Sequence, residues 1–79
     1  MTRTEIFDKV TEYILMQLPV DPSSVTEDAR LVEDLNADSA NLMMLIMDLE
    51  TEFDIQVEDE VLAGIKTVGD IVDYLAARK

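Results

Sequence analysis

The sequence predicts an all-α protein, a four-helix bundle of three long helices and one short helix with a long loop between helices one and two. Three segments carry apolar residues at helical spacing, and capping signals stand near their starts. The 79 residues include only two prolines and two glycines, so few positions force the backbone out of regular structure. No Asn-Gly type of turn joins two alternating runs, so no hairpin is predicted. We expect residues 1–79 to form a single domain.

The first helix is predicted to begin at the sequence TRTE, where Thr2 and Glu5 fit a capping box. Pro19 disfavours a helical backbone at Leu18 and therefore ends this helix. The apolar residues at helical spacing in between are Ile6, Phe7, Val10, Ile14 and Leu18.

The connection from Pro19 to about Ala37 is long for so small a domain, which indicates a loop that is functional or packed against the core. Asp21 and Pro22 predict a short helical turn within it, with the aspartate as the cap. We expect four aliphatic residues to pin the loop to the core, namely Val25, Leu31, Val32 and Leu35.

The second helix is predicted to run from Ser39 to about Phe53. Asp38 is a better N-cap than Ser39, so Ser39 should occupy the first helical position with a free hydroxyl. The core-facing stripe of this helix comprises Leu42, Leu45, Ile46, Leu49 and Phe53.

A second apolar series lies on the other side of the same helix. At about 100° per residue, Ala40, Met43, Met44 and Met47 fall roughly 100° to 200° from Leu42. A helix that is apolar on both sides must bury both or offer one to a partner. One alternative is that the first helix or the long loop covers this series. The other is a docking surface, which flexible and polarisable methionines suit.

The remaining chain predicts a short helix and a long one. Ile55 and Val57 alternate with polar residues and suggest an extended segment, followed by one helical turn from Asp59 to Leu62 that Gly64 ends. The last helix should begin at TVGD, where Thr67 and Asp70 form a cap. Its inner face comprises Val68, Ile71, Val72 and Leu75.

Charge and composition exclude several classes of function. Eighteen acidic residues against six basic ones give a formal net charge of −12, which phosphate backbones and anionic lipids repel. We therefore expect no nucleic-acid partner and no membrane partner. The N-terminal sequence MTRTEIFDKV is interrupted by charges and does not fit a signal peptide, and no run of about 18 apolar residues exists. The expectation is a cytoplasmic monomer.

The chain also lacks cysteine and histidine. These absences exclude disulfides and thiolate metal sites and remove the commonest metal ligand and general base. No side chain is therefore predicted to act as a histidine general base or a thiol nucleophile. In the segment DLNADSANLMML, Asp34, Asn36 and Asp38 match positions one, three and five of a calcium-binding loop, but the match ends there. Ser39 replaces the glycine at position six and Leu45 the glutamate at position twelve, so no metal is predicted.

The segment VEDLNADSANLMMLIMDLETEFDIQVEDE, continued through IKTVGDIVDYL, resembles the acyl carrier protein family over nearly the whole chain. EDLNADS, followed one helix later by LETEFD, is the most specific part. The resemblance implies a four-helix bundle without catalytic activity. It also implies that a phosphopantetheinyl transferase attaches 4′-phosphopantetheine from coenzyme A to Ser39, with Asp38 assisting. The terminal thiol of the arm would then hold acyl groups as thioesters during fatty acid, lipid or polyketide biosynthesis.

The resemblance further implies that the second helix recognises acyl-loading and acyl-processing enzymes with basic or apolar docking surfaces. Met43 and Met47 match positions that commonly contact partners, and Glu50 and Asp59 match acidic positions that often meet basic partner residues. The predicted partner-binding residues are Ala40, Met43, Met44, Met47, Glu50 and Asp59. In this family an acyl chain can enter between the helices, and the predicted lining is Val32, Ile46, Leu49, Ile65 and Leu75.

Some positions depart from the family's pattern. Ala40 follows the serine where leucine is usual, Met44 replaces a glutamate of the best-known fatty acid carriers, and Asn41 replaces a frequent aspartate. Asn36 replaces a common glycine, although asparagine tolerates the left-handed backbone there. We infer a specialised pathway. Two alternatives remain open, an aminoacyl or peptidyl carrier and a helical interaction module without a prosthetic group.

The high negative charge predicts that self-repulsion weakens the fold at low ionic strength. Added salt or millimolar Mg²⁺ should raise the melting temperature because both screen the carboxylates. The expected gain is about 4–8 °C for each kcal/mol of repulsion relieved. Thermal unfolding followed by circular dichroism at several salt concentrations measures it, and an unchanged or lower melting temperature would count against the prediction.

Overall fold

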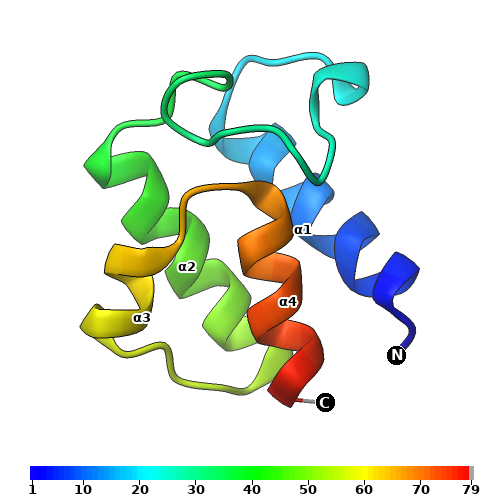
Figure 1. Cartoon of the computed structure of the whole chain (residues 1–79), viewed down its shortest axis with the longest axis vertical. Helices are drawn as coiled ribbons and strands as arrows, with labels where there is room; N and C mark the ends of the chain where they lie inside the picture. Colours follow the sequence, from blue (N-terminus) through cyan, green and yellow to red (C-terminus); the bar gives the residue numbers. More distant parts are fainter. Residues whose placement is uncertain (79) are drawn as a thin grey trace.

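Residues 1–78 are described by a computed structural model, and four α-helices with their connecting loops account for this range (Figure 1). The elements in chain order are α1 Arg3–Gln17, the 3₁₀ turn η1 Pro22–Ser24, α2 Ser39–Phe53, α3 Asp59–Gly64 and α4 Val68–Arg78. Within that range no strand forms, and an isolated antiparallel bridge joins Arg30 to Thr67. The predicted all-α class and the four-helix bundle are confirmed.

Helix α1 begins and ends where its sequence signals predict. The Thr2 hydroxyl accepts a hydrogen bond from the Glu5 N–H at 3.2 Å, and the Glu5 carboxylate accepts one from the Thr2 N–H at 2.7 Å. The bond from the Thr2 backbone holds the pKa of Glu5 below its ordinary value. Leu18, which precedes proline, is already extended at φ −126° and ψ 140°.

The core lies where α1 packs against α2 and α4 (Figure 1). Each long helix contributes the apolar stripe predicted for it, and no polar or charged side chain of residues 1–78 is buried. The buried helical residues comprise Ile6, Val10 and Ile14 of α1, Leu45, Ile46, Leu49 and Phe53 of α2, and Val68, Ile71, Val72 and Leu75 of α4. Area burial of this kind is the main stabilising term for so small a protein.

The long loop between α1 and α2 covers one end of the bundle and is held down by aliphatic side chains (Figure 1). Val25, Leu31 and Leu35 are buried as predicted. Val32 is 53% exposed, so its prediction as a core pin is wrong. Leu31 and Leu35 fill the inward side of the tight turn that contains all three residues, which leaves Val32 pointing outward. Asp21 occupies the cap position of η1 but makes no side-chain cap hydrogen bond, contrary to its predicted role.

Backbone hydrogen bonds tie this loop to the start of α4. The Leu31 N–H donates to the Lys66 carbonyl at 3.0 Å, and the Val68 N–H donates to the Ala29 carbonyl at 3.0 Å. The Gly69 N–H donates to the Glu27 carbonyl at 2.8 Å. The loop therefore behaves as a packed layer and not as a free linker.

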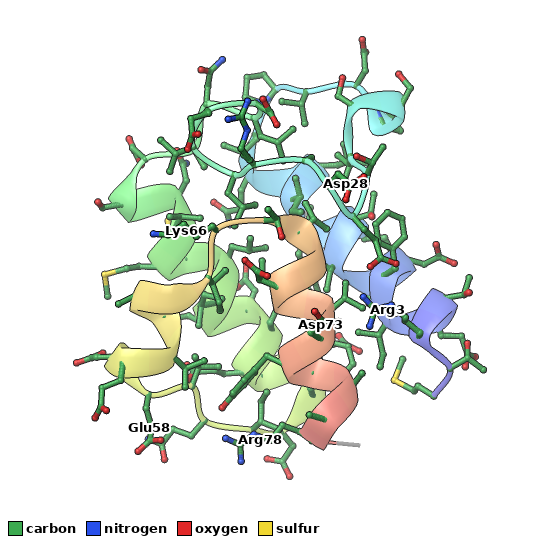
Figure 2. All side chains as sticks on the ribbon, in the orientation of Figure 1. Arg3, Asp28, Glu58, Lys66, Asp73 and Arg78 are labelled. Atoms are coloured by element: carbon green, nitrogen blue, oxygen red, sulfur yellow. The ribbon has the colours of Figure 1, made fainter. Side chains whose placement is uncertain are left out.

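A three-way ionic contact adds to these backbone bonds. Arg3 of α1 pairs with Asp73 of α4 at 2.7 Å (Figure 2). It also pairs with Glu27 of the loop. All three side chains are well exposed, so the contact adds little stability but does join three elements.

The second half of the chain follows the prediction with small differences. Asp54 ends α2 in the left-handed conformation at φ 53°, which the sequence reading missed. Ile55 to Glu58 form a loop without ladder partners. Helix α3 extends through Gly64, two residues beyond the predicted turn, because this glycine keeps a negative φ and continues the helix.

The predicted cap of α4 is present. The Asp70 carboxylate accepts hydrogen bonds from the N–H groups of Lys66 at 2.9 Å and Thr67 at 3.1 Å, and the Thr67 hydroxyl accepts one from the Asp70 N–H at 3.1 Å. The bond from Lys66, followed by that from Thr67, holds the pKa of Asp70 below its ordinary value.

The two glycines should respond oppositely to alanine, although both lie in helices. A Cβ at Gly69 would stand 2.9 Å from the Glu27 carbonyl oxygen, whereas nothing lies within 4 Å of a Cβ at Gly64. Gly69→Ala should therefore destabilise the protein by about 1–3 kcal/mol. Gly64→Ala should stabilise it by about 0.4–1 kcal/mol because it lowers the entropy of the unfolded chain. Urea unfolding of both variants measures the difference, and effects of the same sign would contradict this packing.

Candidate functional site

Ser39 is the first residue of α2, and its side chain is exposed to solvent. Its hydroxyl makes no hydrogen bond to any part of the chain that the structure describes. The other two serines, Ser23 and Ser24, belong to the 3₁₀ turn in the loop and not to an α-helix start. Ser39 is therefore the serine whose hydroxyl is both accessible and placed at the N-terminus of a long helix.

Asp38 takes the cap position that would otherwise engage the serine. Its carboxylate accepts a hydrogen bond from the Asn41 N–H at 2.8 Å, and the Asn41 amide oxygen accepts one from the Asp38 N–H at 3.2 Å. The Leu42 N–H donates to the Asp38 carbonyl at 3.0 Å, as in the first turn of any helix. This reciprocal capping box confirms the prediction that Asp38, not Ser39, caps α2.

The capping box leaves the first two N–H groups of α2 available. The Asn41 and Leu42 N–H groups are satisfied, whereas those of Ser39 and Ala40 find no acceptor within residues 1–78. Free N–H groups and the positive end of the helix dipole favour an anion at this position. A phosphate joined to the adjacent hydroxyl would lie beside both, so the residues fit a phosphate-linked group.

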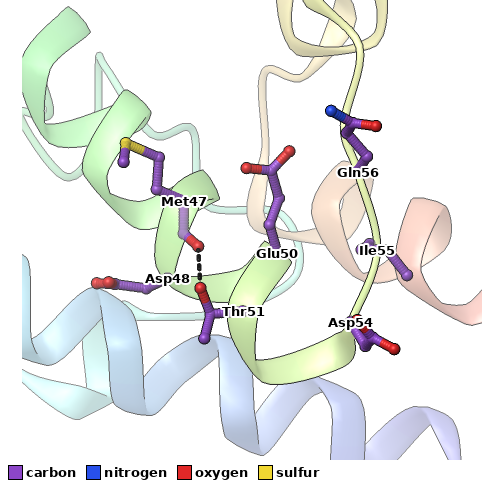
Figure 3. Close-up of a pocket in the computed structure, with 7 residues that line it drawn as sticks. All are labelled: Met47, Asp48, Glu50, Thr51, Asp54, Ile55 and Gln56. Carbon is purple, nitrogen blue, oxygen red and sulfur yellow. Dashed lines mark hydrogen bonds between the residues drawn. The ribbon is translucent and has the colours of Figure 1, made fainter.

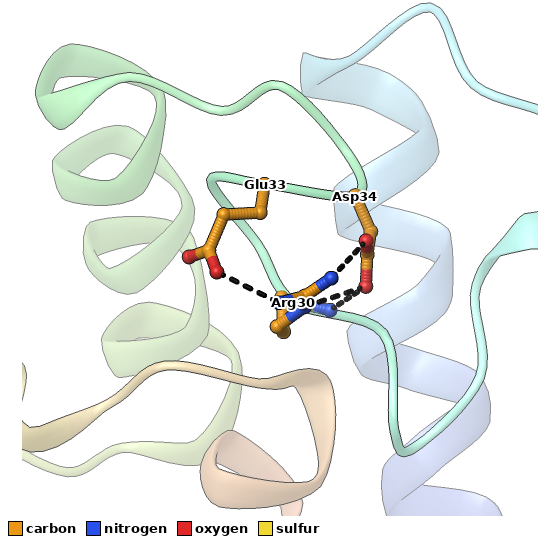
Figure 4. Close-up of polar contacts among 3 residues, drawn as sticks. All are labelled: Arg30, Glu33 and Asp34. Carbon is orange, nitrogen blue, oxygen red and sulfur yellow. Dashed lines mark hydrogen bonds and ion pairs between the residues drawn. The ribbon is translucent and has the colours of Figure 1, made fainter.

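The turn that precedes the site is shaped by Arg30 (Figure 4). Its guanidinium binds Glu33 at 3.0 Å and Asp34 at 3.2 Å, and its backbone N–H donates to the Asp34 carboxylate at 2.8 Å. The Arg30 side chain holds the pKa of Asp34 below its ordinary value. These bonds close the turn that seats Leu31 and Leu35 in the core, immediately before the site.

The chain then turns sharply into α2. Asn36 adopts the left-handed backbone at φ 59°, as the sequence predicts for an asparagine in place of a glycine. The Ala37 N–H donates to the Leu31 carbonyl at 2.9 Å, and Ala37 itself is buried. Asp38 and Ser39 thus follow a fixed point of the backbone.

The second apolar series of α2 is uncovered. Met43, Met44 and Met47 are 55%, 54% and 60% exposed, and Ala40 is exposed as well. We call these four residues the methionine face. The alternative in which α1 or the loop covers them is wrong, because α1 packs on the opposite stripe and the loop turns toward α4.

An open groove continues from the methionine face along the C-terminal half of α2 (Figure 3). Glu50 lies in it, and its carboxylate accepts a hydrogen bond from the Val57 N–H at 2.7 Å. The predicted partner residue Glu50 therefore also holds the segment after α2 in place. The groove is lined by Met47, Asp48, Glu50, Thr51, Asp54, Ile55 and Gln56. Sequence reasoning missed Thr51, Ile55 and Gln56 here, since only the return of the chain after Asp54 brings them together.

The remaining predicted residues fall into different environments. Asp59 is the exposed first residue of α3. Of the predicted acyl-chain lining, Ile46, Leu49 and Leu75 belong to the core and Ile65 packs against it, whereas Val32 is exposed. The helices among residues 1–78 all fall short of the length and apolar character that crossing a membrane requires.

Comparison with known proteins agrees with this geometry. The family model of the phosphopantetheine attachment site matches residues 8–75. A curated acyl carrier protein from Thermotoga maritima is 53% identical over 74 residues, which cover 94% of this chain and 91% of that protein. The chain belongs to the acyl carrier protein family.

Further relatives extend this result to sequence and structure. The acyl carrier protein of Wolinella succinogenes is 45% identical over 74 residues, covering 94% of this chain and 97% of that protein. The solved structure of the acyl carrier protein from Enterococcus faecalis superposes with a TM-score of 0.84 at 37% identity, and each chain is fully covered. This acyl carrier protein therefore uses phosphopantetheine as its prosthetic group and works with a phosphopantetheinyl transferase and biosynthetic enzymes.

Proposed function

We propose that this acyl carrier protein bears its 4′-phosphopantetheine on the Ser39 Oγ and carries acyl intermediates as thioesters in fatty acid, lipid or polyketide biosynthesis. The observation that supports this choice is the exposed Ser39 hydroxyl, which makes no hydrogen bond within residues 1–78. The neighbouring N–H groups of Ser39 and Ala40 likewise find no acceptor there. The arm supplies the terminal thiol that this cysteine-free chain lacks.

The residues around the site give the chain a passive role in its own loading. Ser39 contributes the oxygen that attacks the phosphate, but no histidine exists to remove its proton. The transferase must therefore provide the base, and we propose that the neighbouring Asp38 assists that reaction. Asp38 is held in a fixed orientation by its bonds to Asn41, so its carboxylate is positioned before a partner arrives. The chain itself is not an enzyme in this proposal.

The methionine face, together with Glu50 and Asp59, forms the proposed docking surface. Its exposed thioethers suit apolar patches on a partner, and the surrounding carboxylates suit basic residues. The net charge of −12 would speed association with basic surfaces and repel nucleic acid and anionic membranes. We propose that residues 1–79 act as one monomeric carrier domain in the cytoplasm.

An acyl chain would need room inside the bundle. The proposed lining remains Val32, Ile46, Leu49, Ile65 and Leu75. Ile46, Leu49 and Leu75 are packed in the core, so a chain can enter only if the helices that carry these residues shift. The exposed Val32 would lie at the surface end of such a path.

The composition of the first two turns of α2 supports a specialised pathway. Ala40, Asn41 and Met44 make the start of α2 less acidic and more apolar than in the best-known fatty acid carriers. Because Met44 is 54% exposed, its difference from glutamate is presented directly to partners.

Loading by coenzyme A tests the attachment site. Incubation with coenzyme A and a promiscuous phosphopantetheinyl transferase should add one phosphopantetheine mass to the wild type and none to Ser39→Ala. Ser23→Ala and Ser24→Ala are matched controls, because both serines are exposed but lie in the 3₁₀ turn, and both variants should load like the wild type. Intact mass spectrometry gives the result, and a gain that survives Ser39→Ala would refute the assignment.

Met44→Glu tests the specialised pathway. It should raise kcat/KM with enzymes of an ordinary fatty acid synthase by about two- to fivefold, because a rim charge pair is worth about 0.3–1 kcal/mol. Met16→Glu adds the same charge on α1, outside the docking surface, and should have a smaller effect. Steady-state kinetics with the loaded proteins measure both. If those enzymes already use the wild type with full kcat/KM, the proposal of a specialised pathway is wrong.

A further inference from the structure

The methionines of this protein are distributed unusually. All five are more than half exposed, including Met16 at 71%, whereas the buried core contains only alanine, valine, leucine, isoleucine and phenylalanine. Methionine is ordinarily among the more frequently buried residue types. Because the chain also lacks cysteine, every sulfur atom it contains is a thioether on the surface.

Three of these sulfurs gather on the docking surface. Met43, Met44 and Met47 follow one another on the outward side of α2, four to eight residues after Ser39. Figure 3 shows the Met47 side chain extending from the helix at the edge of the groove. Met16 lies near the end of α1, on a different element, and provides an exposed methionine outside this surface.

We propose that Met43, Met44 and Met47 form an oxidation site, at which peroxide reversibly weakens docking of the carrier to its partners. This inference rests on the proposed function of α2 as the docking helix. It adds a modification and a form of regulation that the carrier function itself does not require.

The chemistry needs only a two-electron oxidant of the peroxide class. A lone pair of the thioether sulfur attacks one peroxide oxygen, an S–O bond forms and the O–O bond breaks. The departing hydroxide takes up the proton released from the transferred oxygen and leaves as water. Sulfur is oxidised by two electrons and the peroxide is reduced by two. A methionine sulfoxide reductase with a dithiol reductant returns the oxygen as water and restores the thioether.

The structure separates this modification from folding. A sulfoxide is polar, so its formation in a core would disrupt packing. Here no methionine is buried, and the inward stripe of α2 is formed by leucine, isoleucine and phenylalanine. Oxidation of the methionine face therefore changes the surface that a partner meets and leaves the bundle intact. Three sulfoxides would replace apolar contacts by strongly hydrated groups at the centre of the docking surface.

The unmodified chain is the best sample for the test, because without the arm it has no thiol and peroxide can act on its sulfur only at methionine. The protein is treated with hydrogen peroxide, the peroxide is removed with catalase, and peptide mapping locates the added oxygen. Loading by coenzyme A and a phosphopantetheinyl transferase is then measured before and after treatment. The ratio of loading after treatment to loading before treatment is also measured for the triple variant Met43→Leu/Met44→Leu/Met47→Leu and for Met16→Leu.

We expect oxidation of the wild type to lower the kcat/KM of loading by about tenfold or more. Burial of a single thioether against the partner already contributes a large part of such a change in affinity. Met16→Leu should show the same loss, the triple leucine variant should show little change on treatment, and methionine sulfoxide reductase should restore the wild type. The melting temperature should change little.

Equal loading before and after oxidation, an equal loss in the triple variant, or unfolding on oxidation would each overturn the inference. These outcomes differ from failure of the proposed function, in which untreated protein would not load or would still load after Ser39→Ala.

Discussion

The pair of hydrogen bonds between Asp38 and Asn41 determines how the rest of the site is arranged. By capping α2, this pair fixes where the helix begins and directs the Asp38 carboxylate to the Asn41 N–H at 2.8 Å. The cap therefore does not use the Ser39 hydroxyl as a hydrogen-bond acceptor. It also leaves the first two N–H groups of the helix without protein acceptors in residues 1–78. A helix capped by Ser39 itself would have hidden both features.

The cap depends in turn on the loop that leads into it. Leu31 and Leu35 anchor the loop in the core, Arg30 closes the turn between them, and Asn36 reverses the backbone. The Leu31–Lys66 backbone bond connects this arrangement to the start of α4. A loop without regular structure can thus hold Ser39 in place, because its side chains are buried and its backbone groups are bonded.

Helix α2 carries two different tasks on its two sides. The inward stripe of Leu45, Ile46, Leu49 and Phe53 holds the helix in the bundle. The outward methionine face contributes nothing to the core and keeps its apolar surface in water. Such a surface has a cost in solubility, which the high net charge offsets. Folding and recognition are in this way assigned to separate residues of one helix.

Much of this arrangement could be predicted from the sequence, because it depends on local signals. The bounds of α2 and the caps at Thr2 and Asp38 follow from neighbouring residues, and the left-handed Asn36 agrees with the glycine that the family commonly has there. The misses depend on distant contacts or on backbone direction. Val32 follows Leu31 in sequence, yet only the turn closed by Arg30 decides which of them faces inward.

The groove shows the same limit. Its lining depends on the reversal of the chain at Asp54, where a non-glycine residue takes a left-handed conformation that no sequence signal demanded. Glu50 was predicted as a partner-binding acid, whereas its structural bond to the Val57 N–H was not, because that bond joins residues on either side of the reversal.

A cap made by Asp38 leaves Ser39 and the adjacent N–H groups free to receive a phosphate. Proton–nitrogen NMR spectra of the ¹⁵N-labelled chain, recorded with and without the attached arm, can detect this arrangement. We expect the largest amide shifts at Ser39 and Ala40, with slow hydrogen exchange retained at Asn41. Shifts centred on the Ser23–Ser24 turn, or an Asn41 amide that exchanges freely in the unmodified protein, would contradict it.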